Sequence, residues 1–186
     1  MTGALLAGGR ARRLGGRPKG LLEFGGIALI DHLIGVLRAL GQAPLIVGDP
    51  AGPYAGRGIE VHPDRLPDRG PPGGVHTALA LAPPGWVCVL SIDLPRIDVA
   101  TLTTLATHRA DQHVVLARAE GHRQPLAAWW HTRAFPIVNE HLQAGRPGFA
   151  PILAALEVTE ITLPPGPFLD VDTEADVQAL GGRWPA

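Results

Sequence analysis

The chain has 186 residues, of which 46% are hydrophobic and 18% are charged, and its formal net charge at pH 7 is −1. This length and composition predict one domain over residues 1–186 with a sizeable buried core. Because the net charge is close to zero, no overall electrostatic field draws the protein to nucleic acid or to a membrane surface, and neither is an expected partner.

The cysteine content and the amino terminus indicate the compartment. Cys88 is the single cysteine, which excludes an internal disulfide and fits a reducing environment. Its apolar neighbours predict an inert buried thiol. The amino terminus lacks the basic and apolar regions of a signal peptide, and no apolar run approaches the roughly 18 residues that span a bilayer. The sequence therefore predicts a soluble, cytoplasmic protein.

The first predicted element is a buried strand over residues 4–7, followed by a loop rich in glycine and cations. The loop contains the pair Gly8 and Gly9, no acidic residue, and the cations Arg10, Arg12, Arg13, Arg17 and Lys19. Glycine lets backbone N–H groups turn toward a ligand with no Cβ in the way, and successive amides of this kind bind anions. We interpret the loop as a site for a polyanion such as a nucleoside triphosphate, in preference to a solvated basic turn.

Helices and strands alternate along the rest of the chain. A helix over residues 28–40 is followed by strands over 45–47 and 59–61, with a loop or irregular helix over 54–58 between them. A loop over 63–74 leads to a helix over 75–81, a strand over 87–92, and a helix over 99–108 with Asp98 as its N-cap. The remaining elements are strands over 114–117 and 126–130, helices over 132–143 and 150–156, a strand over 159–163, and a helix ending at residue 180 that Thr173 and Asp176 cap.

This alternation predicts an α/β fold, a Rossmann-like three-layer sandwich in which helices flank both faces of a mostly parallel sheet. The ligands of such a sheet bind beyond the carboxyl ends of its strands. The glycine-rich loop, Gly48, Asp64 and Asp93 each closely follow a predicted strand. We therefore expect all four to meet at one edge of the sheet.

Asp93 is the predicted metal ligand, since the strand over 87–92 delivers its carboxylate to that edge. Mg²⁺ prefers oxygen and is usually held by one or two carboxylates plus substrate phosphates. The alternative is an Asx turn in which local amides satisfy the carboxylate. The neighbouring glycine-rich loop favours Mg²⁺ as a cofactor held by Asp93. The histidines lack the spacing of a zinc site.

The segment over 63–74, PDRLPDRGPPGG, has two interpretations. Its glycines, including Gly73, lead into a helix start whose amides can approach a nucleotide, and Asp64 can accept hydrogen bonds from the amino or imino group of a base. The other interpretation is a flexible proline-rich turn with solvated acids, which the residues alone favour.

The spacing of the first loop differs from two common phosphate-binding motifs. Gly20 follows Lys19 where a Walker loop needs Ser or Thr, and the spacing G-x-G-x-x-G of dinucleotide-binding proteins is absent. The pattern L-x-G-G-x-x-x-R-x-G-x-x-x-K, formed by Leu6, Gly8, Gly9, Arg13, Gly15 and Lys19, resembles the signature loop of the nucleotidyltransferase superfamily. Within it, LAGGRARRLGGRPKGLLEFGG is most similar to the molybdenum cofactor guanylyltransferase (MobA) family, and the resemblance extends from Leu5 to about Leu180.

The resemblance implies an enzyme that transfers GMP from GTP to the phosphate of molybdopterin and releases pyrophosphate, with Mg²⁺ as cofactor. It also implies transient contact with molybdenum cofactor synthesis proteins or acceptor proteins. The implied catalytic residues are Lys19, Arg13 and Asp93. The implied nucleotide-binding residues are Leu6, Ala7, Gly8, Gly9, Lys19, Gly48, Asp64, Gly73 and Asp93. The implied acceptor-binding residues are Arg123, Gln124, Pro125, Asp170 and Asp172.

Three positions differ from the pattern of this family, because Gly48, Asp170 and Asp172 stand where its members carry asparagine. They keep open a cytidylyltransferase for the same cofactor or another small-molecule nucleotidyltransferase. A non-catalytic nucleotide-binding partner protein is the alternative from another class, although a binder has no need of both Lys19 and Asp93. A nucleic-acid binder is disfavoured, because few aromatic side chains are available for stacking on bases.

Overall fold

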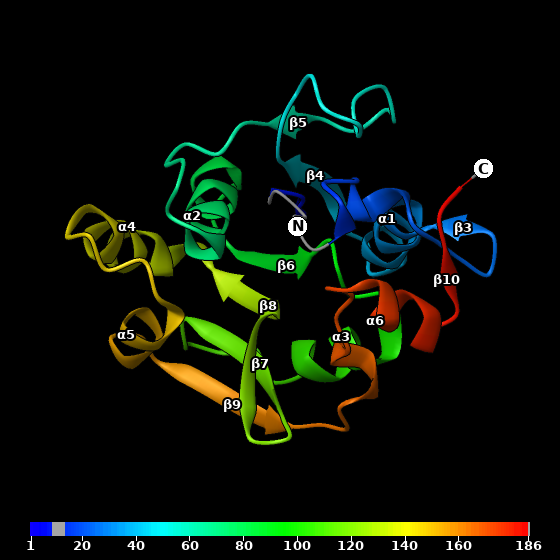
Figure 1. Ribbon diagram of the computed structural model, residues 1–186. Coiled ribbons are helices and arrows are strands. Elements are labelled where there is room, and N and C mark those ends of the chain that lie inside the picture. The colour runs from blue at the N-terminus through cyan, green and yellow to red at the C-terminus, as the bar shows by residue number, and fades with distance from the viewer. Residues whose placement is uncertain (9–13, 186) are drawn as a thin grey trace.

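The computed structural model describes residues 1–8 and 14–185, so the predictions for Gly9 and Arg13 lie outside the described residues. Within these ranges, seven strands form one sheet in the order β5-β4-β1-β6-β8-β7-β9 (Figure 1). The strands are β1 (Thr2–Leu6), β4 (Ala43–Val47), β5 (Val61–His62), β6 (Trp86–Ser91), β7 (Val114–Ala119), β8 (His122–His131) and β9 (Val158–Thr162).

The sheet is mostly parallel, as the sequence predicts. Neighbouring strands run parallel except at β8, which is antiparallel to both β6 and β7. A two-residue turn at Glu120 and Gly121, both with positive φ, joins β7 to β8. Such a turn connects antiparallel strands only, which explains why this one strand is reversed.

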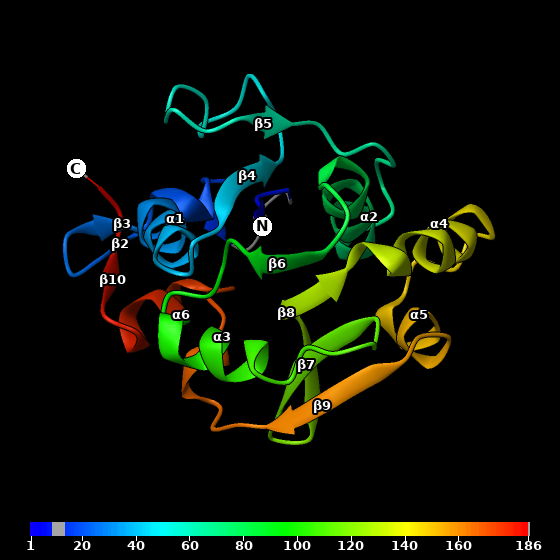
Figure 2. The same ribbon diagram turned by 180° about the vertical axis from the view of Figure 1, so that it is seen from behind.

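Helices cover both faces of the sheet and give the three predicted layers (Figures 1 and 2). The helices α1 (Leu29–Ala39) and α3 (Val99–Ala106) pack on one face. The opposite face carries α2 (Pro71–Leu81), α4 (Phe135–Gln143) and α5 (Phe149–Ala154). No helix in the described ranges is long and apolar enough to cross a bilayer.

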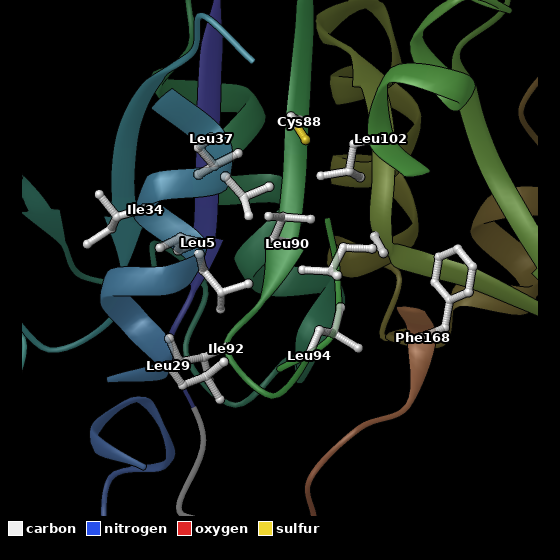
Figure 3. Close-up of a cluster of buried hydrophobic side chains, with 14 of the residues drawn as sticks. Leu5, Leu29, Ile34, Leu37, Cys88, Leu90, Ile92, Leu94, Leu102 and Phe168 are labelled. Carbon is white, nitrogen blue, oxygen red and sulfur yellow. The ribbon is translucent and has the colours of Figure 1, made fainter. Parts of the chain in front are cut away.

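The central strands are apolar on both sides because both sides are buried. In β1, Leu5 joins the core beneath α1 and α3, whereas Ala4 and Leu6 join the core on the opposite face. Successive side chains of a strand point to opposite faces, so such a strand needs a continuous apolar run. Figure 3 shows the first core, in which Leu90 and Cys88 of β6 lie near α1. Cys88 is fully buried, which raises the pKa of its thiol and agrees with the predicted inert role.

The helix α2 begins at Pro71, earlier than the predicted start at Val75. The prediction was wrong because it assigned the PPGG run to a loop. Proline suits the first helical turn, where its fixed φ is helical and its missing N–H has no partner to lose. Gly74 permits close packing on β1, since a Cβ there would lie 3.1 Å from Leu6 Cδ1. The turn-forming residues thus begin the helix and press it onto the sheet.

Most other boundaries differ from prediction by a few residues. β8 begins at His122 instead of residue 126, β5 is shifted to Val61–His62, and residues 132–134 form the 3₁₀ helix η3 (Thr132–Ala134) before α4. The predicted N-cap of α3 is confirmed, because the side chain of Asp98 accepts a hydrogen bond of 2.7 Å from the backbone N–H of Thr101.

A second, three-stranded sheet was not predicted from the sequence. It consists of β10 (Gly182–Arg183), β2 (Glu23–Phe24) and β3 (Ile27–Ala28). Next to it lie the 3₁₀ helix η2 (Lys19–Leu21) and the helix α6 (Glu174–Ala179), which opens with the predicted capping box. A small core of Leu14, Leu22, Val171 and Val177 joins these elements, so the C-terminal segment lies against the segment that follows the glycine-rich loop. The 3₁₀ helix η4 (Gly166–Phe168) precedes this segment.

Candidate active site

The register of the sheet brings four strand ends level at one edge. Leu6, the last residue of β1, pairs with Val47 at the end of β4 and with Ser91 at the end of β6. Val47 in turn pairs with His62 at the end of β5. The segments that leave these strands therefore start side by side, which is the convergence expected from the sequence.

A cleft of about 900 Å³ lies over this edge. Of the residues predicted for the site, those that line it are Leu6, Ala7, Gly8, Lys19, Gly48, Asp64, Asp93 and Asp172. Gly73, Asp170, Arg123, Gln124 and Pro125 are not among the lining residues. The cleft therefore unites most of the predicted nucleotide-binding residues with one of the predicted acceptor-binding residues.

Lys19 lies at the centre of the polar contacts in the cleft. Its ammonium donates a hydrogen bond of 2.6 Å to Asp172 Oδ1 and lies 3.6 Å from Asp93 Oδ2. The Lys19 side chain is only 14% exposed, so both ion pairs are partly shielded from water. Lys19 is also the only lysine of the chain. The predicted cation and the predicted metal ligand thus share one cleft.

Three carboxylates, of Asp93, Asp170 and Asp172, gather around Lys19. Partial burial raises the pKa of Asp170, and the charges of Asp172 and Asp93 raise it further, although the residue as a whole is exposed. The backbone fixes this arrangement, since the N–H of Val171 donates a hydrogen bond of 3.0 Å to the carbonyl oxygen of Asp93. Carboxylate oxygens gathered in this way are the kind of ligand that a divalent cation prefers.

The carboxylate oxygens near Lys19 can hold a metal ion only if a bound substrate supplies further oxygen ligands. Among the described residues, no group of three or more His, Cys, Asp or Glu side chains is arranged to hold a metal ion by itself. Mg²⁺ typically binds one or two protein carboxylates and completes its shell with phosphate oxygens and water. The residues present, with Asp93 at the strand end, therefore fit a cation that arrives with a phosphorylated ligand.

Asp64 lies at the opposite side of the cleft and is held firmly. Its Oδ1 accepts hydrogen bonds from the backbone N–H of Leu66 at 3.0 Å and from the hydroxyl of Thr77 at 2.9 Å. Gly73 leaves room for the other oxygen, because a Cβ at this position would lie 3.0 Å from Asp64 Oδ2. Gly73 therefore contributes space for Asp64 and lies outside the cleft lining.

Gly8 and Gly48 border the cleft directly after β1 and β4. Among the residues that the structure describes, and apart from the chain neighbours of Gly8, no atom lies within 4 Å of a Cβ built on Gly8. A Cβ on Gly48 would make only an ordinary contact of 3.6 Å with Ala7 Cβ. Packing around this Cβ position therefore does not require glycine at residue 48.

Tyr54 is a cleft residue that the sequence analysis missed. Its hydroxyl accepts a hydrogen bond of 3.0 Å from the backbone N–H of Gly20, the residue after Lys19. Gly20 must be small, because a Cβ there would lie 2.7 Å from Tyr54 Cε1. Burial of the phenol raises the pKa of Tyr54. The only sequence signal was a lone aromatic residue in a loop of small residues.

Arg17 also lines the cleft, and the C-terminal segment holds its side chain. The guanidinium carbon lies 4.0 Å from the ring centroid of Trp184, and Nη2 donates a hydrogen bond of 2.8 Å to Glu174 Oε1. Such stacking stabilises a cation on an indole face. The chain after α6 therefore packs over the segment that carries Lys19.

The predicted acceptor-binding segment lies outside the cleft lining. Arg123 donates hydrogen bonds of 2.8 and 2.5 Å to Glu160 Oε1, and Arg118 binds Oε2 of the same glutamate at 2.7 Å. These hydrogen bonds, together with the charges of the two arginines, hold the pKa of the Glu160 carboxyl below its usual value. Leu126, further along β8, does line the cleft. Arg123 thus ties the sheet together in this structure, and its role toward an acceptor stays a prediction.

Comparison with known proteins agrees with this geometry. The profile of the MobA-like NTP transferase domain matches residues 3–159. A probable molybdenum cofactor guanylyltransferase from Deinococcus radiodurans is 36% identical over 187 residues, covering 98% of this chain and 95% of the relative. The molybdenum cofactor guanylyltransferase of Pseudomonas paraeruginosa is 42% identical over 145 residues, which is 74% of this chain and 68% of that protein.

Solved structures share the fold. The crystal structure of molybdopterin-guanine dinucleotide biosynthesis protein A from Archaeoglobus fulgidus superposes with a TM-score of 0.77 at 22% identity, covering 97% of this chain and 96% of the other. The inositol-1-phosphate CTP transferase from T. maritima gives a TM-score of 0.72 at 12% identity, with coverages of 97% and 93%. The same architecture therefore serves different nucleotides and acceptors.

Proposed function

The chain belongs to the MobA-like NTP transferase family, and we propose on this basis that it transfers GMP from GTP to the phosphate of molybdopterin and releases pyrophosphate. This is the activity for which the Pseudomonas relative is named. The single observation that carries the proposal is the separation of 3.6 Å between Lys19 Nζ and Asp93 Oδ2 inside one cleft, at the carboxyl ends of the strands.

The reaction requires positioning and charge neutralisation more than covalent catalysis by the protein. An oxygen of the molybdopterin phosphate attacks the α-phosphorus of GTP, the new P–O bond forms, and the bond to the bridging oxygen of the β-phosphate breaks. Pyrophosphate leaves with that oxygen. The backbone at Gly8 borders the cleft where it can receive phosphate oxygens, and Lys19 offsets the charge that develops on them.

Family membership is consistent with the use of a divalent metal, and we propose Mg²⁺. Asp93 would hold it, and the carboxylates of Asp170 and Asp172 beside it support this choice. When bound, the cation would supply positive charge that offsets the charge of the phosphates and of the leaving pyrophosphate. Lys19, whose ammonium pairs with Asp172 and Asp93, is placed to shift its contacts to the triphosphate.

GTP and molybdopterin are the proposed small-molecule partners. The acceptor-binding roles of Arg123, Gln124, Pro125, Asp170 and Asp172 stay predictions, and Asp172 is the one of these that lines the cleft. Transient contacts with molybdenum cofactor synthesis proteins or acceptor proteins, a single domain over residues 1–186 and a cytoplasmic location stay predictions as well.

The experiment is a coupled assay of the purified chain with molybdopterin, Mg²⁺ and each of GTP, CTP, UTP and ATP. Pyrophosphate release is measured, and the dinucleotide product is identified by mass spectrometry. We expect GTP to be the preferred donor. Stabilisation by CTP alone in a thermal-shift titration, with a cytosine product, would replace the proposal by a cytidylyltransferase. GTP binding without pyrophosphate release in the presence of acceptor would support a non-catalytic nucleotide-binding protein.

A further inference from the structure

We infer that Thr77 is a positioning residue that fixes the carboxylate of Asp64 against the base of the nucleotide and thereby sets base selectivity. The inference rests on the proposed function, since it requires a nucleotide in the cleft. Nothing in the sequence pattern singled out Thr77, which lies on α2 and is fully buried.

The direction of the hydrogen bonds at Thr77 is unambiguous. The backbone N–H of Arg65 donates a hydrogen bond of 2.9 Å to the Thr77 hydroxyl oxygen. The hydroxyl proton is therefore free to be donated, and it goes to Asp64 Oδ1 at 2.9 Å. Thr77 thus connects the rigid helix to the loop at two adjacent residues, one backbone amide and one side chain.

The other contacts of Asp64 leave one oxygen for a ligand. Oδ1 also accepts from the backbone N–H of Leu66, so two donors of the protein share this oxygen. Oδ2 lies beside Gly73, where a Cβ would come within 3.0 Å. The carboxylate is held on one side by Thr77 and bounded on the other by Gly73, and it lines the cleft. Its orientation is therefore fixed before a nucleotide binds.

The order of the strands places Asp64 far from the phosphate end. Asp64 follows β5 and Asp93 follows β6, with β4 and β1 between them. Three spacings of about 4.8 Å between neighbouring strands separate β5 from β6 by roughly 14 Å. A triphosphate near Gly8, Lys19 and Asp93 therefore directs its nucleoside toward Asp64.

An ionised carboxylate only accepts hydrogen bonds, and this restricts the bases that it can bind. Guanine presents two neighbouring donors on one edge, N1–H and the 2-amino group. Inosine triphosphate, ITP, keeps N1–H and lacks the amino group, so it isolates the contribution of that donor. A carboxylate that swings freely would distinguish the two bases less well than one held in place.

The test compares Thr77→Val, which removes the hydroxyl and keeps the shape, with Thr77→Ser, which keeps the hydroxyl. For each protein, kcat/KM is measured with GTP and with ITP, using molybdopterin and Mg²⁺. We expect the wild-type chain and Thr77→Ser to prefer GTP over ITP. In Thr77→Val the ratio of kcat/KM for GTP to that for ITP should fall roughly tenfold, which corresponds to one hydrogen bond to a charged group. A purely structural role would lower both kcat/KM values equally and leave their ratio unchanged.

Two further variants keep the test decisive if Thr77→Val folds poorly. Gly73→Ala pushes on Asp64 Oδ2 from the other side, and we expect it to reduce the same ratio. If the effect of Thr77 passes through the Asp64 carboxylate, it should vanish when Asp64 is replaced by Asn. In Asp64→Asn protein, the ratio of kcat/KM for GTP to that for ITP should therefore be the same with Thr, Ser or Val at position 77. An unchanged GTP to ITP ratio in both Thr77→Val and Gly73→Ala would overturn the inference and leave the proposed function standing. Absence of GTP-dependent pyrophosphate release by the wild-type chain would instead overturn the proposed function itself.

Discussion

The ammonium of Lys19 and the carboxylate of Asp172 form a hydrogen bond of 2.6 Å, although 153 positions separate them in the chain. Lys19 follows the first loop, and Asp172 precedes the last helix, α6. The candidate active site is therefore closed by the C-terminal segment, which belongs to neither face of the main sheet. Side chains that are distant in the sequence, Lys19 and Asp172, thus line the same cleft.

Replacing Lys19 by Ala is expected to lower the rate of GMP transfer by about 100-fold or more, the usual effect of removing one group that stabilises transition-state charge. The fold should persist, because Lys19 lines the cleft and its ammonium pairs with carboxylates that are partly exposed to water. Steady-state kinetics with saturating GTP and molybdopterin measure the rate, and circular dichroism checks the fold. Full activity of Lys19→Ala would contradict the proposed role. Lys19→Arg keeps the charge and changes its geometry, so we expect its rate of GMP transfer to lie between those of wild type and Lys19→Ala.

The single lysine also permits a chemical test of the cleft. An amine-directed reagent has Lys19 as its only side-chain target, besides the terminal amine. We expect GTP with Mg²⁺ to slow reductive methylation of Lys19, because the triphosphate would cover the ammonium of a side chain that is only 14% exposed. Peptide mass spectrometry measures the extent of modification. The terminal amine is the internal control, and equal protection of both amines would show that the nucleotide does not bind at Lys19.

Much of this site was predictable because its residues follow buried strands. Gly8, Gly48 and Asp93 come within two residues of the ends of β1, β4 and β6. Apolar runs locate such strands, and parallel pairing then brings their carboxyl ends to one edge. Asp64 was reached by the same argument, since it follows β5.

The contributions of Tyr54 and Thr77 could not be predicted in this way. Tyr54 reaches Gly20 from a loop without a periodic pattern. Thr77 and its neighbour His76 are the two polar residues of an otherwise apolar helix. Hydrophobic periodicity identifies an element and its buried face, whereas the partner of a single polar side chain depends on the tertiary fold. The strands of the small sheet are two residues long, which is too short for an alternating pattern to be recognised.

The contact between Gly20 and Tyr54 predicts that Gly20→Ala lowers the free energy of unfolding, whereas the same substitution at Gly35, which has no such contact, raises it. Gly20→Ala places a methyl group 2.7 Å from Tyr54 Cε1, so we expect a loss of about 1–3 kcal/mol in the free energy of unfolding. Gly35 lies at an exposed position inside α1, and a Cβ there meets no other described part of the chain within 4 Å. Gly35→Ala should therefore raise the free energy of unfolding by about 0.5–1 kcal/mol. Urea denaturation measures both. Because Gly20 adjoins Lys19, only Gly20→Ala should also reduce GMP transfer, and equal stabilities of the two variants would refute the contact.

Trp184 is expected to matter for nucleotide binding although it lies near the C-terminus. Trp184→Ala removes the indole that stacks on Arg17 and the hydrogen bond of 3.1 Å from Nε1 to Glu174 Oε1. We expect a loss of stability larger than the roughly 0.5–1 kcal/mol of an exposed cation–π contact, because Trp184 also packs against the small core. We also expect a higher KM for GTP, because Arg17 lines the cleft. Urea denaturation and steady-state kinetics measure these. Trp184→Phe keeps a stacking face and serves as the control. If the KM for GTP were unchanged in Trp184→Ala, the contact between Trp184 and Arg17 would have no role in nucleotide binding.

The carboxylates near Lys19 predict a pH-dependent stability that one substitution removes. Partial burial and the charges of Asp172 and Asp93 raise the pKa of Asp170 above its unfolded value. The stability contributed by its protonated form is therefore fully present below the unfolded-state pKa and is lost as the pH rises through the folded-state pKa. Asp170→Asn stays neutral throughout, so it should be more stable than wild type above that pKa and equally stable well below it.

Melting temperatures between about pH 3 and pH 8, without divalent metal, measure this difference across the range in which carboxyl groups titrate. Asp176→Asn is the control of opposite sign. Hydrogen bonds from the side chain and backbone of Thr173 and from the backbone of Asp172 lower the pKa of Asp176. Its ionised form therefore stabilises the fold above the unfolded-state pKa, and Asp176→Asn should be less stable at neutral pH, with the deficit shrinking as the pH falls. If Asp170→Asn followed the wild-type profile at every pH, the burial and the charge repulsion that we assign to Asp170 would be refuted.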